Sequence, residues 1–154
     1  MSELTADQLL GTWELVDFRV EASDGRPARY PFGPNARGRI LYAPDGHMTA
    51  VLSRDPTNRR SGALASLETS HRSAPEDKSA AFDSYLSYSG RWRLDGEQVH
   101  HDIDLALVPG VVGHTQIRDA SLHDGVLRLQ YSRCSRSGTI HTFVLRWMRP
   151  GACR

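Results

Sequence analysis

The chain has 154 residues, of which 39% are hydrophobic and 24% charged, and its formal net charge at pH 7 is +1. This length suits one domain with one hydrophobic core, and the balanced charge gives no reason to expect a nucleic-acid partner. The opening residues MSELTADQLLG lack a basic segment followed by an apolar run, and no stretch reaches the roughly 18 apolar residues of a membrane-spanning helix. We therefore expect a single cytoplasmic domain over 1–154 with no membrane contact.

The first predicted element is a short helix that begins at Thr5, because Thr5 and Gln8 have the spacing of a capping box. Eight segments rich in Val, Ile, Leu, Tyr, Trp and Thr then predict β-strands. They are 11–21, 38–43, 47–53, 87–94, 97–106, 114–122, 126–132 and 139–148. A second helix is expected over 75–86, where Ser73 and Glu76 repeat the capping-box pattern.

Tight turns alternate with longer connections between these strands. The turns are Pro44-Asp45-Gly46, Leu94-Asp95-Gly96 and His123-Asp124-Gly125, and Asp-Gly between apolar runs is the strongest short-range signal of a β-hairpin. In an up-and-down meander the tight turns all lie at one end and the longer connections at the other. The sequence therefore predicts an all-β, eight-stranded antiparallel up-and-down β-barrel with a closed base and a mouth rimmed by loops. The two longest loops, 23–37 and 54–73, are expected to be lids or disordered segments.

The hairpins also predict which side chains face the interior, because residues directly opposite each other project to the same face. With Asp95-Gly96 as a two-residue turn, Trp92 is opposite Val99 and His101 is opposite Gly90. The inward polar groups predicted in this way are Tyr88, His101, Gln116, Arg118 and Tyr131. The inward residues expected to contact a ligand are Met48, Ala50, Leu52, Gly90, Trp92, Ile103, Leu105, Leu129 and Phe143.

The sizes of the inward side chains predict where the barrel is hollow. The base is expected to be crowded by Trp13, Tyr42, Leu94, Leu127 and Trp147, whereas space at mid-height is expected beside Gly38, Ala50, Gly90 and Ala120. A mostly apolar pocket with a few convergent polar groups is the general form of a small-molecule site. The register would change by one residue at a β-bulge, and the pattern of Leu15, Val16 and Phe18 already indicates a bulge in the first strand.

Several sequence motifs resemble a known family. The motif Gly11-Thr12-Trp13 and the closing run LRWMR look like the lipocalin and calycin group, and the runs GRILYAPDGHMTAVL, FDSYLSYSGRWRLDGEQVHH and VVGHTQIRD look like its bacterial and fungal lipocalin-like domain proteins. This resemblance implies that Trp13 is covered at the base by Arg149 or Arg146. It also implies one of two activities, passive carriage of a hydrophobic ligand or cofactor-free cyclase or isomerase chemistry in natural-product biosynthesis.

The sharpest chemical hypothesis concerns His101 and Arg118. An inward arginine stays charged and needs an oxygen partner, and no inward Asp or Glu is expected, so a ligand carboxylate, enolate or ketone is the candidate partner. A histidine can move a proton near neutral pH, and Tyr88 or Tyr131 could donate to a developing oxyanion. The alternative is that these polar groups only satisfy one another as a network that holds the strands in register.

Three functions therefore follow from the sequence. The first is a cofactor-independent cyclase or isomerase acting on a small, mainly hydrophobic, oxygen-bearing molecule, the second is an intracellular carrier of such a molecule, and the third is a filled structural barrel. No metal or cofactor is expected, because His100 and His101 are adjacent on a strand and point to opposite faces. A homodimer is possible, and Cys134 and Cys153 are expected to be free thiols.

Overall fold

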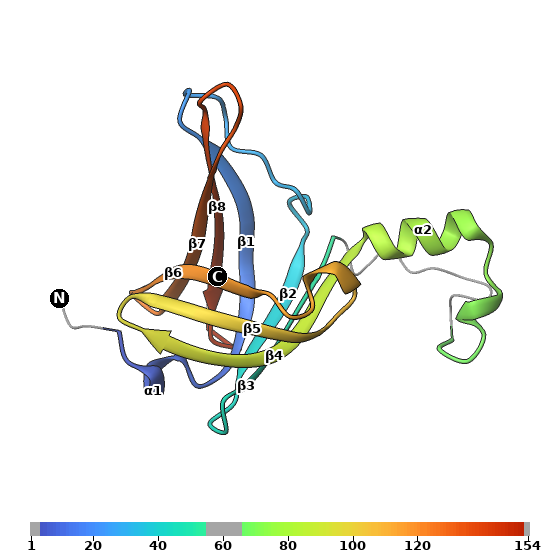
Figure 1. Cartoon of the computed structure of the whole chain (residues 1–154), viewed down its shortest axis with the longest axis horizontal. Helices are drawn as coiled ribbons and strands as arrows, with labels where there is room; N and C mark the ends of the chain where they lie inside the picture. Colours follow the sequence, from blue (N-terminus) through green and yellow to red (C-terminus); the bar gives the residue numbers. More distant parts are fainter. Residues whose placement is uncertain (1–3, 55–65, 153–154) are drawn as a thin grey trace.

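The computed structural model describes residues 4–54 and 66–152, and its strands form a closed antiparallel barrel in the order β1 to β8, with β8 paired to β1 (Figure 1). The strands are β1 (Gly11–Ala22), β2 (Arg37–Tyr42), β3 (His47–Ser53), β4 (Tyr85–Asp95), β5 (Gln98–Ala106), β6 (Thr115–His123), β7 (Val126–Cys134) and β8 (Ile140–Met148). The helices are α1 (Ala6–Leu9) and α2 (Pro75–Asp83), with 3-10 turns η2 (Ser70–Arg72) and η3 (Pro109–Val111). The predicted fold class is confirmed.

The two helices differ in how well the sequence predicted them. At α1 the Thr5 capping box is present, and the Thr5 backbone N–H donates to Gln8 Oε1 at 2.9 Å. At α2 the cap position is Ala74, and among the described residues no side chain caps the helix and the Ser73 hydroxyl has no hydrogen-bond partner, so the second predicted capping box is wrong. Pro75 opens this helix instead, because its fixed φ suits the first helical position. Helix α2 ends at Asp83 and projects from the side of the barrel (Figure 1).

The three tight hairpins set the register of the barrel. The β2–β3 hairpin has Tyr42 opposite Met48, as predicted, and the β6–β7 hairpin has Leu122 opposite Leu127, also as predicted. In the β4–β5 hairpin Trp92 lies opposite His101 rather than Val99, because the two turn residues are 96 and 97. This difference is a shift of two positions, which keeps every side chain on its predicted face.

A β-bulge between Ser89 and Gly90 shifts the pairing of β4 with β5 by one residue, and beyond it the predicted and observed faces of β5 no longer agree. A Cβ atom added at Gly90 would overlap the Asp102 carbonyl oxygen, so the two backbones approach closely there and only glycine fits. Beyond the bulge the β5 residues change faces relative to β4, and Leu105 is 69% exposed. The prediction that Leu105 lines the lumen is therefore wrong.

The predicted bulge in the first strand is confirmed. Leu15 pairs with Trp147 and Asp17 with Arg146, so Val16 is an extra residue on β1. The bulge returns Phe18 to the interior, opposite Leu145. It therefore places an aromatic side chain in the upper half of the lumen that strict alternation from Leu15 would turn outward.

The barrel is divided toward its mouth. Pairing between β1 and β2 stops at Glu14 and Arg39, and pairing between β6 and β7 stops at Asp119 and Gln130. Strands β7, β8 and β1 continue past these points as a three-stranded arm (Figure 1). The β6 residues at 116 and 118 therefore lie at an open seam, beyond the last β6–β7 pair.

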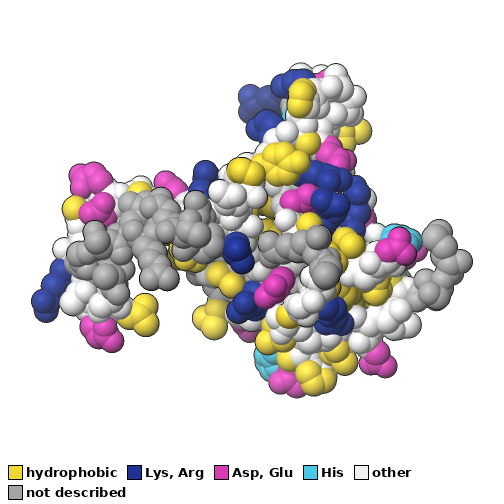
Figure 2. Space-filling view, turned by 180° about the vertical axis from the view of Figure 1, so that it is seen from behind, with side chains coloured by type: hydrophobic (Ala, Val, Ile, Leu, Met, Phe, Trp, Pro, Cys, Tyr) yellow, Lys and Arg dark blue, Asp and Glu magenta, His cyan; other side chains and the backbone are white. Residues whose placement is uncertain are grey.

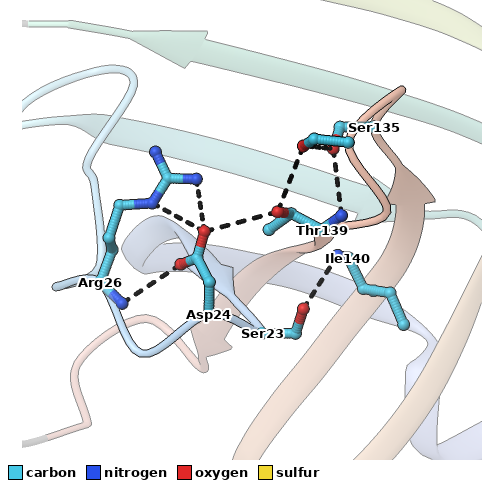
Figure 3. Close-up of polar contacts among 7 residues, drawn as sticks. Ser23, Asp24, Arg26, Ser135, Thr139 and Ile140 are labelled. Carbon is cyan, nitrogen blue, oxygen red and sulfur yellow. Dashed lines mark hydrogen bonds and ion pairs between the residues drawn. The ribbon is translucent and has the colours of Figure 1, made fainter.

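Loops tie the tip of this arm together. The Ile140 backbone N–H donates to Ser23 Oγ at 3.0 Å, and Thr139 Oγ1 donates to Asp24 Oδ2 at 3.4 Å (Figure 3). The Arg26 guanidinium also binds the Asp24 carboxylate, which together with the Arg26 backbone N–H lowers the pKa of that carboxyl to about 2. These contacts fix the 23–37 loop at its start to the β7–β8 connection.

The base is closed by α1 and by the end of β8. The Trp13 indole Nε1 donates to the Leu9 carbonyl oxygen at 2.8 Å, and the Arg149 guanidinium carbon lies 3.8 Å from the centroid of the Trp13 ring. Arg149 also donates to the Gln8 carbonyl oxygen at 2.8 Å. Of the two basic residues that the resemblance offered, Arg149 is therefore the one that covers Trp13, and Arg146 instead pairs with Asp17 on the outer face.

Acidic and basic side chains lie interspersed over the face shown in Figure 2.

Candidate functional site

A cavity of about 70 Å³ lies inside the barrel, above the crowded base. Every strand of the barrel contributes residues to its lining. Trp13 and Tyr42 fill the lower part of the barrel. The lining residues are Phe18, Ile40, Ala50, Leu52, Leu86, Tyr88, His101, Gln116, Arg118, Leu129, Tyr131, Leu145 and Trp147.

The sequence-predicted site residues divide into two groups. Those that line the cavity are Ala50, Leu52, Tyr88, His101, Gln116, Arg118, Leu129 and Tyr131. Those that do not line it are Met48, Gly90, Trp92, Ile103, Leu105 and Phe143. Met48 and Ile103 are buried in the protein, and Trp92 packs on Tyr42 at the base with its indole N–H donating to the Ala43 carbonyl. All five polar groups predicted for the lumen are therefore brought together, while six of its predicted ligand contacts lie elsewhere.

Two of the residues expected to leave space do not. A Cβ atom added at Gly38 would lie 3.0 Å from Leu52 Cγ and 3.2 Å from Leu15 Cβ, so neighbouring side chains occupy that volume. At Gly90 the β5 backbone occupies it. Of the four small residues expected to leave space, Ala50 is the one that lines the cavity.

His101 is held between two tyrosines. Its Nε2 lies 2.9 Å from the Tyr42 hydroxyl oxygen, and its Nδ1 lies 3.0 Å from the Tyr88 hydroxyl oxygen. The side chain is 1% exposed, and burial, with a further contribution from the positive charge of Arg118, lowers the pKa of His101 to about 3. Burial also raises the pKa of Tyr88 to about 12 and that of Tyr42 well above its ordinary value. All three groups are therefore neutral near pH 7.

This environment differs from the one that the sequence-based hypothesis assumes. Burial lowers the pKa of His101 to about 3, and both of its ring nitrogens are already hydrogen-bonded to tyrosine hydroxyls. The pattern around His101 on β5 gave no sign of this, because Tyr42 is 59 positions away in the sequence. A catalytic role for His101 stays a prediction.

Arg118 lies at the open seam between β6 and β7. Its Nη2 donates to Gln116 Oε1 at 2.5 Å, its Nη1 donates to the Ile117 carbonyl oxygen at 2.9 Å, and its guanidinium carbon lies 4.1 Å from the centroid of the Tyr131 ring. Burial lowers the pKa of Arg118 from its ordinary value. Within residues 4–54 and 66–152 no carboxylate forms an ion pair with it. The site thus contains a partly buried cation that has no counter-charge from the described protein.

The comparisons with known proteins place the chain in a family. A family model described as a lipocalin-like domain matches residues 10–150. The chain belongs to the lipocalin-like domain family. No curated protein matches the sequence.

Two solved structures resemble this lipocalin-like domain, each at 14% sequence identity. A lipocalin-like protein from Bacteroides uniformis has a TM-score of 0.42, with 88% of this chain and 96% of that chain covered. An uncharacterized protein from Bacteroides eggerthii has a TM-score of 0.41, with 88% and 98% covered. The family and the barrel together suggest small-molecule binding.

The aromatic side chains of the lipocalin-like lumen extend from the cavity toward the mouth. The rings of Tyr131 and Phe143 stack with centroids 4.6 Å apart and an angle of 5° between their planes. On the neighbouring strand β1, the centroid of the Phe18 ring lies 5.9 Å from that of Phe32, which belongs to the 23–37 loop. Phe32 packs against the hydrophobic core of the barrel, whereas Tyr30, from the same loop, is 47% exposed. Part of the 54–73 loop lies outside the described residues.

The cavity floor carries a polar atom without a partner. Trp147 is 1% exposed and lines the cavity, and its indole Nε1 has no hydrogen-bond partner among the described residues. The predicted ligand contacts did not include Trp147, which was expected in the base, or Phe18, Ile40, Leu86 and Leu145. The alternation of β8 does predict Phe143, Leu145 and Trp147 on the inward face, and the last two of these line the cavity.

In the part of the chain that the structure describes, no group of three or more His, Cys, Asp or Glu side chains is arranged to hold a metal ion. None of the described helices is long and apolar enough to cross a membrane. Cys134 is a free, exposed thiol, and Cys153 lies outside the described residues.

Proposed function

We propose that the protein binds one small, mainly hydrophobic molecule in the barrel lumen, with an oxygen atom of that molecule directed at Arg118. The observation that carries this proposal is the absence of a described carboxylate partner for Arg118, although the guanidinium is partly buried against the Tyr131 ring. A buried charge without a counter-charge is costly, and a ligand oxygen would relieve that cost. The surrounding wall of leucines, aromatic rings and Ala50 suits the remainder of such a molecule.

The size of the cavity constrains the ligand. Its volume of about 70 Å³ is well below the roughly 300 Å³ of the smaller drug-sized ligand sites. A molecule of a few non-hydrogen atoms fits without rearrangement, and a larger one would extend through the seam toward the mouth. This limit also keeps the filled structural barrel as the alternative that any binding experiment must exclude.

Non-catalytic binding is the activity that the geometry supports best. The pKa of His101 is about 3 and that of Tyr88 is about 12, so neither of these cavity groups exchanges a proton readily near neutral pH. A carrier needs only shape, apolar surface and a partner for the ligand oxygen, and these are present. We therefore propose an intracellular carrier of a small hydrophobic, oxygen-bearing ligand.

A cofactor-independent cyclase or isomerase of natural-product biosynthesis is the second candidate. It is favoured by the position of Arg118 and Tyr88 on the same cavity, where donors from both could hold negative charge on a substrate oxygen in the transition state. Such an enzyme would rely on holding the substrate in a reactive conformation, since the residues at hand supply no base at neutral pH.

The test uses the pure protein, a metabolite extract of its source organism, and two arginine variants. Arg118→Gln removes the cavity cation, whereas Arg133→Gln removes an arginine that also lies over the Tyr131 ring, at 5.6 Å, but does not line the cavity. A compound retained at one per protein by the wild type and by Arg133→Gln, but lost by Arg118→Gln, supports the carrier. A compound converted over many turnovers to an isomer or to a product lighter by water supports the enzyme. If no compound is retained or converted, both proposals are wrong and the filled barrel is favoured.

A further inference from the structure

The hydrogen bonds around His101 determine the direction in which protons are donated. Tyr42 is fully buried, and among the described residues its hydroxyl has one partner, His101 Nε2. The Tyr88 hydroxyl likewise has one described partner, His101 Nδ1, but Tyr88 lines the cavity and Tyr42 does not. Because a neutral imidazole has one donor and one acceptor nitrogen, the two tyrosines cannot play the same part.

The two tautomers of His101 have different consequences. If Nε2 carries the proton, it donates to the Tyr42 oxygen, and the Tyr42 O–H is then left without an acceptor in a fully buried position. If Nδ1 carries the proton, the Tyr42 O–H donates to Nε2 and the Nδ1–H donates to the Tyr88 oxygen. Each arrangement leaves one tyrosine O–H unpaired by His101. In the first it is the Tyr42 O–H, in a fully buried position, which carries the desolvation cost of an unpaired hydroxyl, whereas in the second it is the Tyr88 O–H, which faces the cavity. The Nδ1–H tautomer is therefore favoured, because it pairs the fully buried Tyr42 hydroxyl.

This choice leaves the Tyr88 O–H free to point into the cavity as a donor. The other cavity groups have the same character. The Arg118 guanidinium has donors only, the unpartnered Trp147 Nε1 is a donor only, and Gln116 Oε1 is already occupied by Arg118, which leaves the Gln116 amide N–H groups. Among the described lining side chains the remaining acceptors are the Tyr131 hydroxyl and the second lone pair of Gln116 Oε1, so free donors outnumber free acceptors.

We infer that Tyr42, acting through His101, fixes the Tyr88 hydroxyl as a hydrogen-bond donor, so that the cavity selects ligands whose buried polar end is an acceptor-only oxygen: a carboxylate, an enolate or a ketone. This inference rests on the proposed ligand site and adds the chemistry that the site recognises. A ligand that buries a hydroxyl or amine there leaves its own proton facing donors, which is unfavourable in a water-poor lumen. Tyr42 is a positioning residue in this scheme, since it does not line the cavity.

The first test measures the tautomer of His101 directly, by ¹⁵N NMR of the imidazole in the full-length protein without ligand. We expect a protonated Nδ1 and an acceptor Nε2 at neutral pH. In Tyr42→Phe the donor to Nε2 is gone, and we expect the preference between the tautomers to weaken. Trp92→Phe is the matched control, because it removes the ring that packs on Tyr42 but keeps the Tyr42 hydroxyl. A protonated Nε2 in the wild type would overturn the inference.

The second test compares butyrate, 2-pentanone and 1-pentanol, which have equal numbers of non-hydrogen atoms and suit the small cavity. We expect butyrate to bind about tenfold more tightly than 1-pentanol, with 2-pentanone between them, as one charge-assisted hydrogen bond is worth about that factor. The ratio should fall severalfold in Tyr42→Phe and stay unchanged in Trp92→Phe.

The outcomes separate this inference from the proposal on which it rests. If 1-pentanol binds as tightly as butyrate, the lumen is a ligand site but the inferred selectivity for acceptor-only oxygens is wrong. If none of the three probes binds at any concentration tested and the source extract also yields no retained compound, the proposed function itself is wrong. Equal effects of Tyr42→Phe and Trp92→Phe on the ratio would show that Tyr42 acts through packing alone, which would overturn its assigned role.

Discussion

Burial of neutral His101 should make the protein lose stability as the pH falls from about 7 to 5. The pKa of this group is about 3 in the folded protein, against an ordinary value of 6.5 that the unfolded chain would show. Burial and the positive charge of Arg118 from β6 lower this pKa, and His100 lowers it further. Asp102 on β5 raises it, but by less than burial or Arg118 lowers it, and Tyr42 and Tyr88 hydrogen-bond to the ring.

The sign and size of the effect follow from proton linkage. Below pH 6.5 the unfolded chain binds a proton at His101 that the folded protein does not bind, so protons favour unfolding. The contribution of this group to stability is present above the unfolded pKa and is lost progressively as the pH falls toward the folded value. Between about pH 8 and pH 5 the loss is about 2 kcal/mol, since each unit below the unfolded pKa contributes about 1.4 kcal/mol.

Urea unfolding at these two pH values measures the effect, with His101→Gln as the test variant. Glutamine has a donor and an acceptor but does not titrate, so His101→Gln should lose about 2 kcal/mol less than the wild type over the same interval. His123→Gln is the control, because His123 lies exposed at the β6–β7 turn and should leave the wild-type pH dependence in place. Equal pH dependence in the wild type and in His101→Gln would refute the argument that a neutral imidazole is buried here.

Three further predictions concern the bulge, the base and the cavity. Gly90→Ala should lower the free energy of unfolding by about 3 kcal/mol or more, because its new methyl meets backbone rather than a movable side chain. Gly110→Ala is the control, because open space surrounds Gly110, and its melting temperature should stay nearly unchanged. Similar melting temperatures for both variants would contradict the close backbone approach at Gly90. Arg149→Gln should lower the free energy of unfolding in urea by about 1 to 2 kcal/mol, because it removes the cation that covers the Trp13 indole ring at the base. An unchanged urea midpoint would show that apolar packing alone closes the base. Ala50→Leu should fill the cavity and abolish butyrate binding in an NMR titration while the fold persists, and retained binding would place the ligand outside the lumen.

Local features of the sequence determined the barrel itself. Alternating apolar residues and three Asp-Gly turns predicted eight strands whose observed bounds agree to within two residues, because strand pairing across a tight turn depends mainly on residues near that turn. The same local logic identified the bulge in β1 and the five polar residues that line the cavity. A family resemblance carried by the motifs around Trp13 and Arg149 predicted how the base is closed, and the contact between those two residues confirms it.

The tertiary structure decided what those polar residues can do. The sequence placed His101 in the lumen but could not pair it with Tyr42, which reaches it from β2, three strands away around the barrel. Nor could it foresee that the bulge at Gly90 turns Leu105 outward, since a single extra residue reverses the alternation beyond it. The burial and protonation state of His101, like the volume of the cavity, depend on side chains that meet only when the barrel closes. The direction of the hydrogen bonds from Tyr42 through His101 to Tyr88 depends on the same side chains.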